Sequence, residues 1–148
     1  MDAFHRQLND FFVESFNHIL RQEEAIIRKT GESPLTISEL HLVEAISQCE
    51  AGENTVSDIA AQLHITLSSV TIGVNKLVQK GYAQKDRSRT DGRSVHITLT
   101  EQGQRMEAEH RRFHEGMVEA VARELEQEER DTLLVAMEKL AAYFRRQP

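Results

Sequence analysis

The sequence predicts a mostly α-helical fold with one short β-hairpin, and three observations lead to this class. Apolar residues recur at helical spacing through most of the chain. The pattern changes to alternation only over residues 82–99, where the turn signal "DG" separates two short runs. The length of 148 residues, with 39% hydrophobic and 28% charged residues, is typical of one globular domain. We therefore expect helices on both sides of a single hairpin.

Residues 3–29 predict a long amphipathic helix. Gly31 and Pro34 in "TGESP" predict its end, because both residue types interrupt helices. Its apolar side chains recur every three or four residues and so share one stripe. These side chains are Phe4, Leu8, Phe11, Phe12, Phe16, Ile19, Leu20, Ile26 and Ile27.

Three short helices are expected next. "TISE" (residues 36–39) has the spacing of a capping box and opens a helix to about Cys49. "TVSD" (55–58) repeats this start signal for a second, shorter helix. After the tight connection "HIT", a third helix runs from "LSSV" to Gly81, a glycine suited to the position just past a helix end.

The hairpin and two further helices complete the prediction. "YAQKD" and "SVHITL" are the expected strands. Thr100 can cap a long helix through about residue 124, and "EQEER" begins a final helix. The apolar stripes of these two helices contain Met106, Phe113, Met117, Val121, Leu125, Leu133, Leu134, Met137, Leu140, Ala141 and Phe144.

The net charge of −6 is unevenly distributed. Residues 31–65 carry six acidic residues and no Lys or Arg. Residues 66–98 carry six basic and two acidic residues, a net +4, and residues 115–148 carry eight acidic and five basic residues, a net −3. An acidic protein with one basic stripe is typical of local phosphate binding. A solvated charged face would explain the charge alone equally well.

The order of elements favours the phosphate-binding interpretation. A short helix, a tight turn and a second helix form a helix-turn-helix, whose second helix can lie in the DNA major groove. The hairpin that follows, tipped with arginines, can act as a wing that reaches phosphates and the minor groove. Because the basic stripe covers this helix and this wing, the sequence predicts a winged helix-turn-helix that binds double-stranded DNA.

Several side chains are candidates for contacting DNA. Val70, Val74 and Leu77 are expected to pack inward. The remaining face of the recognition helix would read bases, with Ile72 touching a thymine methyl group. The serines at its start could instead serve as an N-cap. The DNA-binding candidates are Ser68, Ser69, Thr71, Ile72, Asn75 and Lys76 on the helix and Lys85, Arg87, Arg89 and Arg93 on the wing.

The long outer helices predict a homodimer. Residues 34–99 would form the DNA-binding region, and residues 1–33 and 100–148 a helical dimerisation region of the same composite domain. The alternative is that these helices pack within one chain. Two-fold symmetry favours the dimer, because a DNA module gains a second half-site from it. The expected interface residues are Phe4, Phe11, Phe12, Phe16, Leu134, Met137 and Phe144.

Four polar residues predict a second site. His110 and His114 are spaced i, i+4 and share a helix face. Glu23 lies within the stripe of the first helix, and His41 lies off the main apolar side of its own helix. One glutamate and three histidines suit a tetrahedral zinc site. A buried polar network that holds the helices together is the other interpretation.

Other functional classes find little support. The histidine pair reads "HRRFH", with Arg111 where a metalloprotease carries its glutamate, and no G-x-S-x-G, P-loop or G-x-G-x-x-G motif occurs. We therefore expect no enzyme. A helical adaptor without DNA binding is disfavoured by the basic wing. No apolar run approaches the roughly 18 residues of a membrane span, the N-terminus does not resemble a signal peptide, and the single Cys49 forms no internal disulfide. A cytoplasmic protein is expected.

The chain resembles the MarR family of transcription factors along essentially its whole length. The most specific part is "SSVTIGVNKLVQKGYAQKDRSRTDGRSVHITLTEQG" (68–103). "FNHILRQEEAIIRK" and "HRRFHEGMVEAV" are similar, more narrowly, to the FabT-like repressors of bacterial fatty-acid synthesis. This resemblance implies an obligate dimer, a palindromic operator, and acyl carrier protein bearing a long acyl chain as corepressor. The chain departs from many members at Ile72 and Gly73, where they carry a basic residue.

The resemblance leaves the second site with three interpretations. Zinc-responsive members of the MarR family look similar at Glu23, His41, His110 and His114. The FabT-like members carry similar residues, and there the implied effector is an acyl chain. The four residues thus predict a zinc site, a polar network beside an acyl pocket, or a purely structural network.

Overall fold

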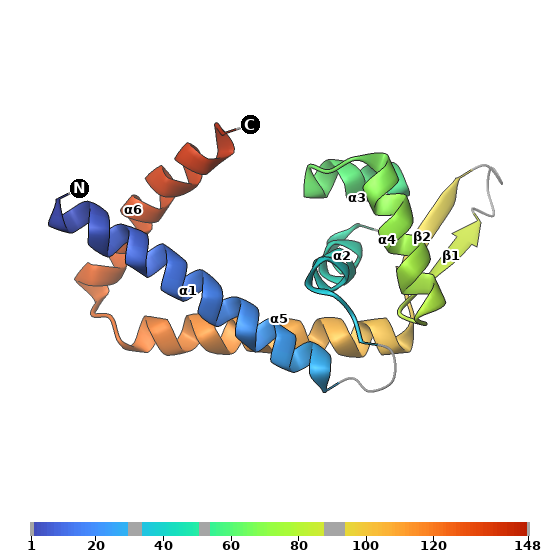
Figure 1. Ribbon diagram of the computed structural model, residues 1–148, viewed down its shortest axis with the longest axis horizontal. Coiled ribbons are helices and arrows are strands. Elements are labelled where there is room, and N and C mark those ends of the chain that lie inside the picture. The colour runs from blue at the N-terminus through green and yellow to red at the C-terminus, as the bar shows by residue number, and fades with distance from the viewer. Residues whose placement is uncertain (1, 30–33, 51–53, 88–93, 148) are drawn as a thin grey trace. The chain divides into compact units, whose positions relative to one another are not determined.

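The computed structural model describes residues 2–29, 34–50, 54–87 and 94–147 (Figure 1). The expected turn at Asp91-Gly92 and the helix breaker Gly31 lie outside these residues. The elements, in chain order, are α1 (Ala3–Arg28), α2 (Ile37–Gln48), α3 (Val56–Leu63), α4 (Leu67–Gln79), β1 (Ala83–Arg87), β2 (Val95–Leu99), α5 (Glu101–Arg123) and α6 (Gln127–Arg145). The predicted fold class is confirmed: the protein is mostly helical, with one two-stranded antiparallel hairpin. It forms two compact units, residues 1–110 and 111–148.

Two capping boxes start the helices of the first unit where the sequence predicts them. Thr36 Oγ1 accepts from the backbone N–H of Glu39 at 3.2 Å, and the Glu39 carboxylate accepts from the N–H of Thr36 at 2.8 Å. Thr55 and Asp58 make the same reciprocal pair at the start of α3. Each box satisfies N–H groups that have no partner within the helix itself.

The end of α4 also follows its local sequence. Gly81 adopts a positive φ of 84°, a conformation that suits glycine because it has no Cβ. The N–H of Gly81 donates to the carbonyl of Val78 at 3.1 Å, and the N–H of Tyr82 donates to the carbonyl of Leu77 at 2.9 Å. This pair of bonds is a Schellman motif. It turns the chain from the helix directly into the hairpin.

The hairpin is attached to the segment that precedes α3. Strands β1 and β2 pair antiparallel, from Ala83 opposite Leu99 to Arg87 opposite Val95. On the other side of β2, the N–H of Ile97 donates to the carbonyl of Asn54 at 2.8 Å, and Asn54 Nδ2 donates back to the carbonyl of Ile97 at 2.7 Å. These bonds hold the hairpin against the helix-turn-helix.

The core of the first unit lies among α2, α3, α4 and the hairpin, with contributions from α1 and α5. Val70, Val74 and Leu77 are fully buried, which confirms their expected packing role. The outward face of α4 is thereby left for contacts outside the chain. The other core members are Ile27, Leu35, Leu40, Leu42, Val43, Ala45, Ile46, Ile59, Ala60, Tyr82, Ala83, Ile97 and Met106.

The second unit consists of the C-terminal part of α5 and helix α6. Glu126 and Glu129 form a capping box at the start of α6, where the sequence predicts the final helix. No described residue of α6 is buried. Among the residues that the structure describes, no helix is both long and apolar enough to cross a membrane.

Candidate nucleic-acid interface and histidine cluster

The outward face of α4 is polar and accessible. Ile72 is 57% exposed on this face. In Figure 1, α4 and the hairpin lie next to each other, which agrees with the direct contact between α4 and β1. All six candidates on the helix are exposed: Ser68, Ser69, Thr71, Ile72, Asn75 and Lys76.

Part of the hydrogen-bonding capacity of this face is used within the helix. Thr66, and not one of the serines, is the N-cap, and it accepts from the N–H of Ser69 at 3.2 Å. The hydroxyl of Ser69 lies 2.9 Å from the Thr66 hydroxyl, and Thr71 donates its hydroxyl proton to the carbonyl of Leu67 at 2.9 Å. Thr71 therefore presents an acceptor to any base edge, since its donor is already used.

The glycine in the middle of α4 allows a close approach to α2. A Cβ at Gly73 would lie 2.7 Å from Leu42 Cδ2, closer than real contacts allow. A glycine in the middle of α4 therefore has a structural basis in the close packing of α4 on α2.

The wing contributes basic residues unequally. Lys85 and Arg87 are exposed on β1, and Lys85 Nζ donates to Asn75 Oδ1 at 2.5 Å. Arg89 and Arg93 lie outside the described residues and remain predictions.

Lys80, which contributes to the basic stripe of the sequence, has an internal role. Its Nζ lies 2.7 Å from the carboxylate of buried Glu39 and 2.9 Å from the carbonyl oxygen of Pro34. Burial raises the pKa of Glu39, but hydrogen bonds from Lys80 and Thr36 outweigh burial, so the pKa lies below its usual value. The pair joins α2 to the end of α4, and its charge is largely compensated there.

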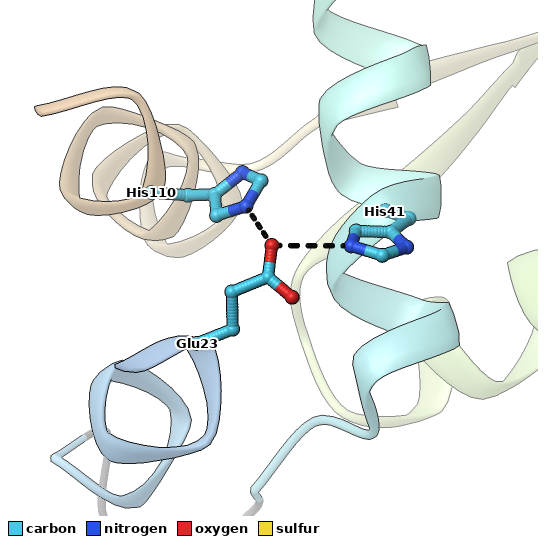
Figure 2. Close-up of side chains that lie close together, drawn as sticks. All are labelled: Glu23, His41 and His110. Atoms are coloured by element: carbon cyan, nitrogen blue, oxygen red, sulfur yellow. Dashed lines mark hydrogen bonds and ion pairs between the residues drawn. The ribbon is translucent and has the colours of Figure 1, made fainter. Parts of the chain in front are cut away.

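A histidine–glutamate cluster joins three helices of the first unit (Figure 2). Glu23 Oε1 lies 2.9 Å from His110 Nε2 and 3.2 Å from His41 Nε2. Glu23 and His110 are each only 2% exposed, whereas His41 is exposed. Glu23 comes from α1, His41 from α2 and His110 from α5, so the structure brings three of the four predicted residues together. His114 lies one turn further along α5, in the second unit, and remains a prediction.

The charges in the cluster favour an ionised glutamate. Burial raises the pKa of Glu23, but hydrogen bonds and attraction from His110 and His41 outweigh it, so the pKa lies below its usual value. A carboxylate only accepts hydrogen bonds, so both histidine Nε2 atoms carry the proton and donate. Each imidazole Nδ1 then faces away from Glu23, and His110 Nδ1 lies 3.9 Å from a Glu44 carboxylate oxygen.

Glu44 is a member of this environment that the sequence interpretation missed. The sequence spacing could have identified it, because Glu44 follows His41 by three residues on α2 and so shares the same face of that helix.

The three side chains also have the composition of a metal site. One ligand atom from each of Glu23, His41 and His110 lies within 4.8 Å of the other two. Zinc bonds of about 2.0–2.1 Å in a tetrahedron place neighbouring ligand atoms roughly 3.3 Å apart. The measured separations of 2.9 and 3.2 Å from Glu23 Oε1 are close to that value. The residues present therefore fit a zinc ion after small shifts and the loss of the Nε2 protons.

A cavity of about 440 Å³ opens one helical turn from the cluster. Ile26 of α1 and Met106 of α5 line it, together with buried Tyr82 and the charged residues Lys29 and Arg105. A volume in this range suits a small ligand, and the mixed lining combines apolar side chains with two basic residues and the acidic Glu109.

A helix-turn-helix with an accessible polar recognition face and an attached wing defines the class of winged helix-turn-helix transcriptional regulators. Residues 26–110 match the family described as "Transcriptional regulator SarA/Rot", and the chain belongs to this family of MarR-type regulators. The family is one of transcriptional regulators and not of enzymes.

Several known proteins are similar to the chain. The crystal structure of Streptococcus pneumoniae FabT in complex with DNA is 30% identical, covers 95% of this chain and 97% of that one, and has a TM-score of 0.83. The HTH-type transcriptional regulator YwhA of Bacillus subtilis (strain 168) is 30% identical over 90 residues. This match spans 61% of the present chain and 65% of YwhA. The S. aureus MepR–DNA complex shares the fold at 16% identity, with a TM-score of 0.71 and coverage of 90% and 94%.

Proposed function

We propose that the protein is a cytoplasmic homodimeric repressor that binds a palindromic operator in double-stranded DNA. The observation that carries the proposal is the exposed polar face of α4 beside the basic hairpin, in a chain that is otherwise acidic. The α4 face would enter the major groove, and the wing would neutralise phosphates. The DNA complex of FabT, at 30% identity over nearly the whole chain, supports this assignment.

The dimer is proposed from apolar side chains that the single chain leaves exposed. Phe4, Phe11 and Phe16 of α1 are each more than 60% exposed, and Phe12 is 37% exposed. Leu134, Met137 and Phe144 of α6 are each more than 50% exposed. Apolar surface of this extent is typical of an interface. A two-fold axis would then place two recognition helices in major grooves roughly 34–36 Å apart.

The proposed effector is acyl carrier protein bearing a long acyl chain, acting as corepressor of fatty-acid synthesis genes. The resemblance of "FNHILRQEEAIIRK" and "HRRFHEGMVEAV" to the FabT-like repressors, which implies this corepressor, supports it. So does the cavity beside Ile26 and Met106, because it adjoins the helices that carry Glu23 and His110. In this proposal the cluster is a polar network that couples the cavity to α2 and hence to the DNA-binding region.

Zinc is a second candidate effector, favoured by the geometry of Glu23, His41 and His110. The three residues would hold the ion, which would add positive charge between three helices and fix their spacing. Under this alternative the protein is a zinc-responsive regulator.

A mobility-shift assay with genomic fragments tests the proposed function. The full-length protein should retain particular fragments, and sequencing them should show an inverted repeat. Affinity should fall steeply with salt, by about 0.9 in log affinity per neutralised phosphate for each log unit of salt. Failure to retain any fragment at low salt would instead favour a helical adaptor that does not bind DNA.

A further inference from the structure

Asn75 of the recognition helix and Lys85 of the wing form one structural unit. Lys85 Nζ lies 2.5 Å from Asn75 Oδ1, and both side chains are exposed. They come from α4 and β1, two elements that pack directly against each other. Asn75 lies three residues after Ile72 and four after Thr71, so it shares their outward face.

The ammonium group determines which amide atom it contacts. Lysine Nζ carries three N–H donors and no acceptor, so its partner is the amide oxygen and not the nitrogen. The two N–H donors of Asn75 Nδ2 are left for a ligand, and Lys85 keeps about two more. The pair therefore presents donors and a positive charge beside the one lone pair that Asn75 Oδ1 keeps, where an isolated asparagine would present one donor group and an acceptor with no charge beside it.

This arrangement alters the base that the amide recognises. In the major groove guanine offers two neighbouring acceptors, N7 and O6, whereas adenine offers the N7 acceptor beside the N6 amino donor. An isolated asparagine pairs with adenine by accepting from N6. With Lys85 Nζ bound to that oxygen, the N–H of an adenine N6 amino group would point towards the positively charged ammonium group. Two donors would then face each other, which is unfavourable. We propose that Asn75 and Lys85 form a composite reader that selects guanine in each operator half-site, an inference that rests on the proposed function.

Selection of binding sites from random double-stranded DNA tests this inference. The full-length wild-type protein should enrich an inverted repeat. At one position of each half-site it should select guanine, and this selection should depend on Asn75. In Asn75→Ala that position should lose its preference. In Lys85→Met, which keeps the length of the side chain but removes its donors, adenine should replace guanine there. The ratio of affinities for guanine and adenine sites should change by about 5-fold to 150-fold, the range for one bidentate base contact.

Two further variants separate base reading from general charge. Lys85→Arg retains a cationic donor and should keep the guanine. Arg87→Met removes an exposed charge from the same strand as Lys85, on the wing that would neutralise phosphates, and should weaken binding to all sites alike, with the selected sequence unchanged. Circular dichroism should show that each variant is folded, because the substituted positions are all exposed.

The outcomes are distinct. If the wild type enriches no sequence, the proposed DNA-binding function fails. If the wild type enriches an inverted repeat but Lys85→Met selects the same base, the composite reader is overturned. A uniform loss of affinity in Lys85→Met, like that of Arg87→Met, overturns it too, because Lys85 would then contact phosphate only.

Discussion

Gly103 packs directly against the backbone of Tyr82. A Cβ at Gly103 would lie 2.0 Å from the carbonyl oxygen of Tyr82 and 3.2 Å from Leu99 Cβ. The same carbonyl accepts from the N–H of Thr100 at 3.1 Å, and Thr100 Oγ1 accepts from the N–H of Gly103 at 3.2 Å. The start of α5 is thus fixed to the strand that begins the wing.

Gly103→Ala should destabilise the protein by about 1–3 kcal/mol or more, because the methyl group meets backbone that cannot rotate away. The free energy of unfolding from urea titration measures the change. Gly116→Ala is the matched control in the same helix, with nothing within 4 Å of the added Cβ. It should be neutral or stabilise by up to about 1 kcal/mol through helix propensity. Equal effects of the two substitutions would contradict the close contact.

Glu23→Gln should remove an acid-sensitive part of the stability. The pKa of Glu23 lies below its ordinary value of 4.5 in the folded chain. The stability that ionised Glu23 contributes is therefore complete above about pH 4.5. It is lost as the pH falls through the pKa of Glu23 in the folded chain, which is the lower of the two values. We expect Glu23→Gln to cost about 1–3 kcal/mol at pH 6, where the ionised hydrogen bonds to His110 and His41 are intact.

Urea titrations at several pH values between 6 and 3 measure this dependence. The difference between wild type and Glu23→Gln should shrink towards pH 3. Glu24→Gln is the control, since Glu24 is exposed and pairs with Arg28 on the surface at 3.2 Å. A surface pair of this kind contributes roughly 0–1 kcal/mol. If the loss of unfolding free energy in Glu23→Gln does not vary with pH, the ionised carboxylate of Glu23 is not the source of that stability.

Local signals account for most of what the sequence predicted correctly. Thr36, Thr55 and Gly81 each act through bonds to residues within four positions, so their roles can be predicted without tertiary structure. Helical spacing and family resemblance also led to the set Glu23, His41, His110 and His114. The first three lie together in the structure, and His114 stays a prediction.

The pairs that the sequence did not predict depend on tertiary contacts. Lys80 belongs to the basic stripe in the sequence, but its partner Glu39 lies 41 residues away and is buried. Asn54 carries no motif signal, although it is bonded to a strand more than 40 residues further along. Such pairs are set by the packing of helices, which periodicity alone does not determine.

Asn54→Ala should loosen the wing. Asn54 Nδ2 donates to the carbonyl of Ile97 at 2.7 Å, and Asn54 Oδ1 lies 2.7 Å from His96 Nδ1. Removing both bonds should cost about 1–3 kcal/mol, because half-buried groups on β2 lose their partners. Operator affinity should fall too, since the wing is no longer held against the helix-turn-helix. Gln84→Ala, at an exposed position of β1, is the control. If Asn54 holds the wing, only Asn54→Ala should lower both the free energy of unfolding and the operator affinity.

Elemental analysis and titration can identify the effector. Protein purified without chelator is analysed for zinc and then assayed for operator binding with zinc or with long-chain acyl carrier protein. If the cluster is a polar network beside an acyl pocket, zinc should be below one-tenth equivalent and the acylated carrier protein should tighten binding. Stoichiometric zinc that is lost in His110→Ala, together with zinc-dependent binding, would support the zinc-responsive alternative. No response to either addition would leave the cluster with a structural role.

The dimer prediction depends on exposed phenylalanines of α1. Phe11 and Phe16 are 62% and 63% exposed in the single chain. Burying a phenylalanine contributes roughly 1.5–3 kcal/mol, and a two-fold interface counts each residue twice. Since only the exposed part of each ring, somewhat under two thirds, remains to be buried, the double variant Phe11→Glu/Phe16→Glu should lose roughly 4–8 kcal/mol of association free energy. It should sediment as a monomer at micromolar concentration, where the wild type is a dimer.

Val95→Glu on the hairpin is the control for this experiment, because it places a glutamate at a 38% exposed apolar position outside the predicted interface. It should leave the wild-type sedimentation unchanged. A wild-type chain that is monomeric at micromolar concentration would refute the dimer outright. If the double variant remains dimeric, the dimer interface does not depend on these phenylalanines of α1. Because each half-site binds one recognition helix, a monomeric variant should also lose the steep, two-site affinity for an inverted repeat while retaining weak binding to a single half-site.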